Sequence, residues 1–224
     1  MLVLALAAAS IIAAGRLLRS GYMHQAGWEQ NEPRVLIVPV GIAGRAGSVP
    51  PPELLRDLVG ELASSLCLDY EIGESVELPA RLLASEREQV EAHRALATLI
   101  ARYRAQPYFR FLFITEEDLY VRGLNFVFGL AAPGGRAAIV SNARFGEEPA
   151  GSRVLENGVP LERLTKVALH EIGHTLLLRH SDDPRSVMKY HNSLAELDAS
   201  GGGFTQTDIR GILYAYPGLE GRVR

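Results

Sequence analysis

The sequence predicts an α+β domain with an α/β-like core: a mixed, mostly parallel sheet with an antiparallel edge strand, a long central helix and a C-terminal helix. Three observations predict it. Short β-branched runs alternate with segments of helical periodicity, three strand candidates then follow closely, and two helical segments end the chain. With 224 residues, 47% of them hydrophobic, the chain is long enough for one sizeable core. We expect one domain over 33–224, preceded by an N-terminal segment and linker over 1–32.

The first half of the domain alternates strand and helix. Residues 34–40 form a β-branched run that ends in turn residues and predict a buried first strand. Residues 53–65 predict a helix, and 68–78 a strand-like stretch. A second, highly charged helix is expected over about 85–105. Its predicted apolar stripe is Val90, Leu96, Ile100 and Tyr103.

The second half predicts the rest of the sheet. Strand candidates cover 109–115, 124–131 and 137–141, and Gly134-Gly135 supplies a tight turn between the last two. A long helix is expected from about residue 160, and a final helix over about 207–215.

Charge and cysteine content exclude several classes of protein. The net charge is -3, and acidic and basic residues are evenly mixed, so no basic face for nucleic acid and no acidic tail is expected. Cys67 is the only cysteine, which excludes an internal disulfide framework and a cysteine-built zinc site.

The first residues read as a targeting segment. Residues 2–15 are almost wholly apolar and are closed by Arg16 and Arg19. About 14 residues are short of the ~20 that span a bilayer and suit a signal peptide, with a membrane anchor or a buried helix as alternatives. We expect an exported or membrane-anchored protein, possible membrane association through 2–15, and otherwise a cytoplasmic location.

The long helix carries the chemistry. His170 and His174, four residues apart, lie about 40° apart on one helical face, and Glu171 stands beside them. His180 reaches the same cation only if the chain leaves the helix and turns back. Three neutral imidazoles leave a fourth tetrahedral position open, as in catalytic zinc sites. A solvated helix face is the alternative for the pair alone, and Asp182, Asp183 or His191 are the alternatives to His180.

The sequence around this motif resembles a known clan and family. His170, Glu171, His174, His180 and then Met188 resemble the metzincins, whose extended motif ends in a methionine turn. Residues 111–115, 118–120, 123–131 and 138–141 with Arg144 look like the archaemetzincins, which are zinc peptidases, and the resemblance covers most of 34–209. It implies a mixed sheet over an active-site helix, with the strand near 124–130 at the cleft edge beside an extended substrate.

The resemblance implies residue roles and one zinc ion per chain. His170, His174 and His180 match the metal ligands, Glu171 the general base, and Met188 the methionine turn. Tyr190 occupies the place of an oxyanion-stabilising tyrosine in astacins and serralysins; a tyrosine packed under the site is the alternative. Asn125 and Phe126 are substrate-binding candidates, although half of any strand faces the core.

Two departures from the family stand out. The family's second, structural zinc site needs four cysteines, and the matching positions are Ser181, Ser186, Thr205 and Asp208, so we expect that site to be absent. The end of the chain is instead similar to the closing helix of matrixins, which predicts a packed helix there. Leu177 replaces the glycine at which the motif turns, so a strained or shifted turn is expected.

The predicted function is hydrolysis of peptide bonds by a metal-activated water, with a peptide or protein as substrate and the chain as a monomer. The alternative is a catalytically silent metal-binding module of the same fold that holds extended peptides. A structural domain without metal is the third hypothesis, and it leaves the three histidines unexplained.

Overall fold

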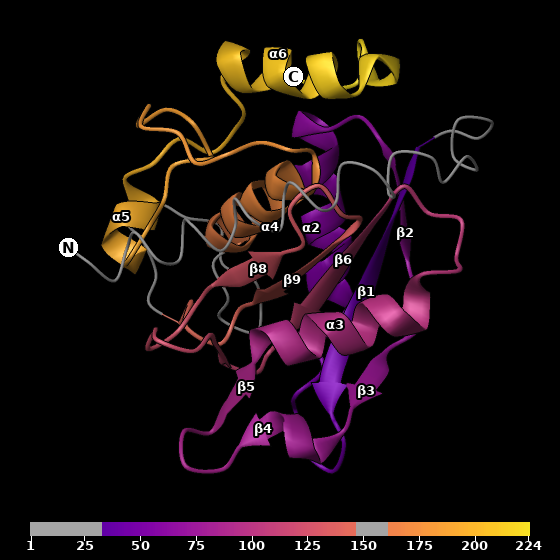
Figure 1. Cartoon of the computed structure of the whole chain (residues 1–224), viewed down its shortest axis with the longest axis vertical. Helices are drawn as coiled ribbons and strands as arrows, with labels where there is room; N and C mark the ends of the chain where they lie inside the picture. Colours follow the sequence, from indigo (N-terminus) through magenta and orange to yellow (C-terminus); the bar gives the residue numbers. More distant parts are fainter. Residues whose placement is uncertain (1–32, 147–160) are drawn as a thin grey trace.

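A computed structural model describes residues 33–146 and 161–224, and its centre is a mostly parallel sheet of order β2-β1-β6-β9-β8, with β3 also paired to β1 (Figure 1). Every pair is parallel except the edge pair of β8 and β9. The sheet therefore confirms the predicted mixed topology with an antiparallel edge strand. Its strands are β1 (Arg34–Ile42), β2 (Asp69–Ile72), β3 (Val76–Leu78), β6 (Arg110–Thr115), β8 (Gly129–Ala131) and β9 (Ala137–Ser141).

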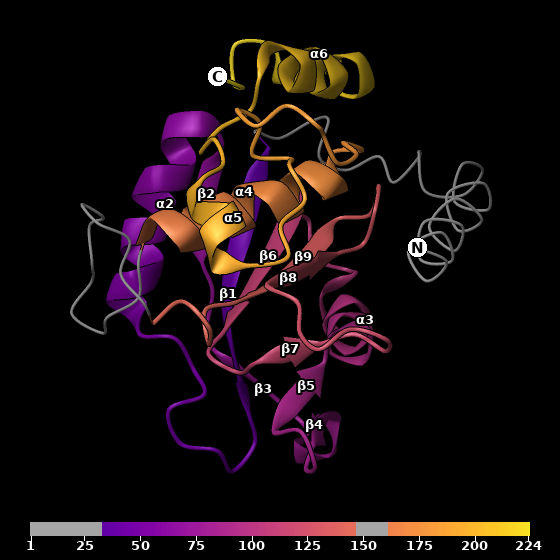
Figure 2. The same cartoon turned by 90° about the vertical axis from the view of Figure 1, so that its left-hand side faces the viewer.

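Helices cover both faces of this sheet, with α2 and α4 on one side and α3 on the other (Figures 1 and 2). Alternate residues of each strand enter the two cores. Val35 and Leu112 pack toward α2 and α4, while Leu36 and Phe113 pack toward α3. Strands buried on both faces read as continuous apolar runs, which is why the sequence identified them. The helices are α2 (Pro52–Ser65), α3 (Ala92–Tyr103), α4 (Leu161–Thr175), α5 (Leu194–Asp198) and α6 (Gln206–Ala215), with short 3-10 turns η2 (Ala80–Leu82) and η3 (Pro217–Leu219).

The second predicted helix begins later than the sequence indicated. It starts at Ala92, and the residues before it form the β4 (Leu83–Ala84) and β5 (Gln89–Glu91) hairpin, in which Glu88 has φ 51°. The Glu91 side chain accepts a hydrogen bond from the Arg94 N–H at 2.8 Å and so caps the helix. Val90 is therefore a buried strand residue and not part of a helical stripe.

The predicted strand over 124–131 is also shorter, because only Gly129–Ala131 joins the sheet. Gly123 turns the chain with φ 89°, and remote side chains then bind the carbonyl of Asn125: Arg87 at 2.8 Å and Gln89 at 2.9 Å. These side-chain hydrogen bonds take the place of the strand-to-strand backbone bonds that the predicted strand would have made at Asn125. Nearby, the unpredicted β7 (Leu119–Tyr120) pairs with β5 in a second, three-stranded sheet of order β4-β5-β7.

The predictions for residues 1–32, including the signal or anchor segment at 2–15, lie outside the described residues. Within 33–146 and 161–224, none of the helices has the length and apolar character needed to cross a membrane.

Candidate metal centre

The helix α4 carries the His-Glu motif and lies between the sheet and the C-terminal part of the chain. Leu164, Ala168 and Ile172 are buried in the core that α4 shares with α2 and the sheet. On the other side, a Cβ atom at Gly173 would lie 2.4 Å from the Met188 sulfur, so only glycine allows this approach. Burial from two sides fixes α4 as a rigid support for its polar residues.

The chain leaves α4 through the turn that the histidine spacing requires. The Leu178 N–H donates to the Gly173 carbonyl and the Leu177 N–H to that of His174, the bond pattern of a Schellman cap. Leu177 holds the left-handed position with φ 70° and a side chain that is 52% exposed. A Cβ atom at Gly134 would lie 2.6 Å from the Leu177 side chain, so this glycine leaves room for the leucine. The expected strained turn is thus present.

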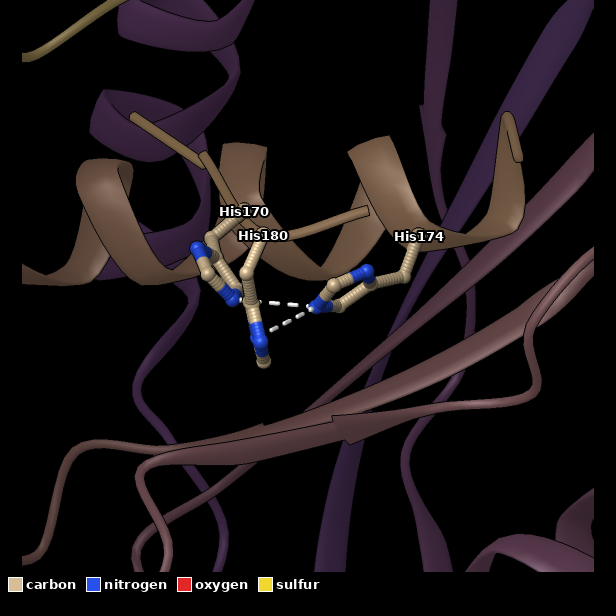
Figure 3. A group of neighbouring side chains, drawn as sticks. All are labelled: His170, His174 and His180. Carbon is tan, nitrogen blue, oxygen red and sulfur yellow. Dashed lines mark hydrogen bonds between the residues drawn. The ribbon is translucent and has the colours of Figure 1, made fainter. Parts of the chain in front are cut away.

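The turn brings three imidazoles together (Figure 3). The His174 Nε2 atom lies 3.0 Å from Nε2 of His170 and 3.2 Å from Nε2 of His180. On the other ring edge, Nδ1 of His170 lies 2.8 Å from the Val187 carbonyl and Nδ1 of His174 lies 3.0 Å from the Leu178 carbonyl. A carbonyl only accepts, so both Nδ1 atoms carry the proton and both Nε2 lone pairs face inward.

Facing lone pairs at these distances repel one another, a cation between them would remove that repulsion, and zinc fits the spacing. Zn–N bonds of about 2.05 Å at tetrahedral angles place the nitrogens roughly 3.3 Å apart, close to the spacing observed here. Among the described residues, the cluster whose ligand atoms all lie within 4.8 Å of one another consists of His170, His174 and His180. These three could hold a metal ion.

The environment keeps the three imidazoles neutral, which is the form that binds metal. Burial, and then the neighbouring His174, lower the pKa of His170 well below its ordinary value. Burial also lowers the pKa of His174, and burial with the nearby His174 and His191 lowers the pKa of His180 to about 4. Near pH 7 the cluster therefore offers lone pairs and carries no positive charge of its own.

Glu171 lies beside this cluster, under the edge strand β8. A Cβ atom at Gly129 would lie 2.6 Å from Cγ of Glu171, so the glycine makes room for the glutamate. The Ala131 N–H donates to the carboxyl group, and burial nevertheless raises the pKa of Glu171 to about 8. A bound divalent cation would favour the ionised form. Sequence analysis missed Gly129, although a glycine within a predicted strand is a signal of close approach.

A tight turn over residues 186–189, which we name the Met188 turn, lies beneath the histidines. Its Lys189 N–H donates to the Ser186 carbonyl at 3.1 Å, and Met188 is fully buried. The Val187 carbonyl faces Nδ1 of His170, and the Met188 carbonyl accepts from the Ser181 N–H at 2.9 Å, next to His180. The turn thus contacts the His170 ring directly and the backbone of the residue that follows His180.

The other predicted site residues, Tyr190, Asn125 and Phe126, lie outside the histidine cluster. Tyr190 is 42% exposed and its ring lies 5.0 Å from that of His180. Asn125 and Phe126 lie on the loop that leads into β8, and Phe126 packs on Phe128 and Arg144.

The residues considered as alternatives to His180 do not enter the cluster. The ring of His191 is 6.2 Å from that of His170, and Asp183 pairs with Arg185 at 2.8 Å. Asp182 is likewise outside the set of ligand atoms that meet.

Comparison with known proteins places this geometry in context. The model of peptidase family M54 matches residues 101–212. An archaemetzincin of Methanopyrus kandleri is 40% identical over 128 residues, covering 57% of this chain and 68% of that protein. A crystal structure of the archaemetzincin from this organism has a TM-score of 0.68 at 27% identity, over 87% of this chain and 99% of that one. A zinc-dependent peptidase from Methanocorpusculum labreanum has a TM-score of 0.65 at 26% identity, over 80% of this chain and 99% of that one.

Proposed function

This chain belongs to peptidase family M54 and is a zinc-dependent metallopeptidase, and we propose that it cuts peptide bonds with Glu171 as general base. One observation carries the proposal. Three Nε2 atoms meet at 3.0 and 3.2 Å beside the buried Glu171 carboxyl group, whose pKa burial raises to about 8. A buried carboxyl group is costly to ionise, and a cation held at the histidines would offset that cost.

We assign His170, His174 and His180 as the ligands of one zinc ion per chain. The rings of His170 and His174 are preset by the carbonyls of Val187 and Leu178, and outer contacts of this kind orient metal-binding histidines. Zinc bound by three protein ligands polarises a substrate carbonyl and lowers the pKa of water. The buried Met188 side chain packs against α4 at Gly173, next to the ligand His174.

Glu171 moves the proton in this scheme. Its carboxylate takes a proton from the attacking water and passes it to the nitrogen of the leaving amine. The Ala131 N–H holds the carboxyl group in place, and Gly129 gives it room directly under the strand. Tyr190, exposed beside His180, is proposed to donate to the oxyanion that develops on the substrate.

The edge strand β8 is the proposed substrate platform. Phe128 and Ala132 make hydrogen bonds to β9, with Ser141 N–H donating to Phe128 and Ala132 N–H to Ala137, each at 2.9 Å. Antiparallel pairing alternates, so the backbone groups of Gly129 and Ala131 point away from β9. An extended peptide can add to this edge with its scissile bond over the metal. Asn125 and Phe126, on the loop before β8, are proposed to contact the same peptide.

Other predictions from the sequence stand as proposals. The substrate is a peptide or protein, and we propose that the chain acts on it as a monomer. Association with a membrane through residues 2–15, export or anchoring, and otherwise a cytoplasmic location, are proposed from the composition of that segment alone.

The test measures zinc content and peptide cleavage on the same full-length protein. Elemental mass spectrometry of the wild type is expected to give about one zinc per chain. Glu171→Ala should keep that zinc and lose cleavage by at least about 100-fold, because general acid-base catalysis contributes roughly that much. His180→Ala should lose zinc, whereas His93→Ala, a change at an exposed histidine far along the sequence on α3, should not.

Two outcomes would contradict the proposal. Undiminished cleavage by Glu171→Ala would remove Glu171 from the mechanism. Zinc binding and peptide binding without cleavage across a diverse peptide library would favour the silent module of the same fold, for which the strained Leu177 turn is the specific motive.

A further inference from the structure

A buried carboxylate joins the Met188 turn to the closing helix α6. Asp208 is 6% exposed, and its Oδ2 atom accepts three hydrogen bonds. The donors are the Ser186 hydroxyl at 2.7 Å, the Thr205 N–H at 2.7 Å and the Thr205 hydroxyl at 2.6 Å. All three donors are neutral groups, and all three bonds end on the same carboxylate oxygen.

Asp208 has two separable roles in this junction. With Thr205 it forms the capping box that begins α6, which is a local contact within one helix. With Ser186 it makes a contact that spans 22 residues and reaches the Met188 turn. The two roles use different donors, so each can be removed without the other.

Ser186 transmits this contact to the turn itself. Its side chain is fully buried, and its hydroxyl oxygen accepts a hydrogen bond from the Met188 N–H at 3.0 Å. The hydroxyl proton is directed to Asp208, so the oxygen lone pair is free for Met188. The carboxylate thereby fixes which way the hydroxyl points.

The Met188 turn orients His170 and contacts the residue that follows His180. The Val187 carbonyl accepts from Nδ1 of His170 at 2.8 Å, and the Val187 N–H donates to Gly203 at 2.8 Å on the approach to α6. The Met188 carbonyl accepts from Ser181, the neighbour of His180. A change in the turn therefore moves the carbonyl that orients the His170 ring and the carbonyl that holds the backbone next to His180.

We infer that Ser186, held by Asp208, is a positioning residue for the metal centre: it sets the Met188 turn, and the turn orients the His170 imidazole. The inference rests on the proposed zinc site. Contacts outside the ligand set govern how long a metal ion stays bound, because they hold the ligands at the bonding geometry. The closing helix thus bears on zinc retention through a hydrogen-bonded path.

The test compares Ser186→Ala with Thr205→Ala in the zinc-loaded full chain. Ser186→Ala removes the path and leaves the capping box, whereas Thr205→Ala removes the cap hydroxyl and leaves the Ser186–Asp208 bond. Zinc release to a chromogenic chelator is followed without substrate, and urea denaturation is measured beside it. Ser186→Ala should release zinc about tenfold faster than the wild type. Thr205→Ala should lower the urea midpoint and release zinc at the wild-type rate.

Asp208→Asn provides a second variant should Ser186→Ala not fold. It weakens both roles and should release zinc faster than Thr205→Ala. Equal release rates for Ser186→Ala and the wild type would overturn the inference, as would equal acceleration in Ser186→Ala and Thr205→Ala at equal loss of stability. A wild-type chain that binds no zinc would instead overturn the proposed function, and this inference with it.

Discussion

The central sheet and the segment over 176–205 are held in place by different interactions. Strands β1 and β6 are buried on both faces, and apolar side chains from α2, α3 and α4 surround them. The segment 176–205 contains one short helix, α5, and contributes only scattered apolar side chains to the same core: Leu176, Val187, Met188, Leu197 and Phe204. Between these anchors, hydrogen bonds of backbone and polar groups fix its path. The sheet therefore supplies most of the apolar burial, and the segment supplies much of the geometry of the metal centre. Substitutions in the two regions should have separable effects.

The largest effect on stability is expected in the sheet. Leu112, on β6, is fully buried in the core between the sheet and the helices α2 and α4. Leu112→Ala should lower the free energy of unfolding by about 2–5 kcal/mol, from lost apolar burial and the cavity that remains. Zinc bound per folded molecule should be unchanged. Urea denaturation measures the free energy of unfolding, and elemental analysis of the folded fraction measures the bound zinc. Leu112→Met is the volume-conserving control. Loss of zinc from folded Leu112→Ala would show that the sheet and the metal centre are not independent.

A smaller loss of stability with a large loss of activity is expected where the edge strand β8 contacts α4 beside the metal centre. In Gly129→Ala the new Cβ would lie 2.6 Å from Glu171 Cγ, so the glutamate must move. Overpacking of this kind costs about 1–3 kcal/mol, and a displaced general base should lower kcat at least about tenfold. Peptide cleavage and denaturation are measured together. Gly60→Ala is the control, since that position on α2 has open space around it; an active Gly129→Ala enzyme would show that Glu171 tolerates displacement.

The smallest effect is expected at the turn after α4. Leu177→Gly removes the strain of a leucine at φ 70° but adds backbone freedom to the unfolded chain, so a net gain of only about 0.5 kcal/mol is expected. Zinc content should stay the same, because the backbone already has the conformation that His180 needs. Thermal unfolding of the zinc-loaded protein measures the change. A loss of stability would mean that packing of Leu177 over Gly134 outweighs its strain.

The sequence predicted the regions whose order comes from local pattern. Residues 34–40 and 109–115 were identified as strands because burial on both faces requires unbroken apolar runs, and His170 and His174 as a pair because helical spacing alone brings them together. The turn after Leu176 followed from the need to bring back His180.

What the sequence did not predict depends on contacts between distant residues. The strand expected over 124–131 is mostly a loop because Arg87 and Gln89, more than thirty positions away, bind its carbonyls. The helix expected over 85–105 loses its first turns to pairing of β5 with β7. Ser186 and Asp208 were noted only as positions where cysteines are missing, and nothing in their spacing indicated that one would hydrogen-bond to the other.

The junction at Asp208 also bears on when the ion is acquired. The Met188 turn is closed by hydroxyl, amide and carboxylate groups, which need no metal to bond to one another. The turn can therefore be complete in a newly folded chain. Zinc then binds histidines that the folded chain already holds close together, and its uptake follows folding instead of driving it. A cell short of zinc would on this account accumulate a folded, inactive reserve that becomes active when the ion is supplied, without a further round of synthesis.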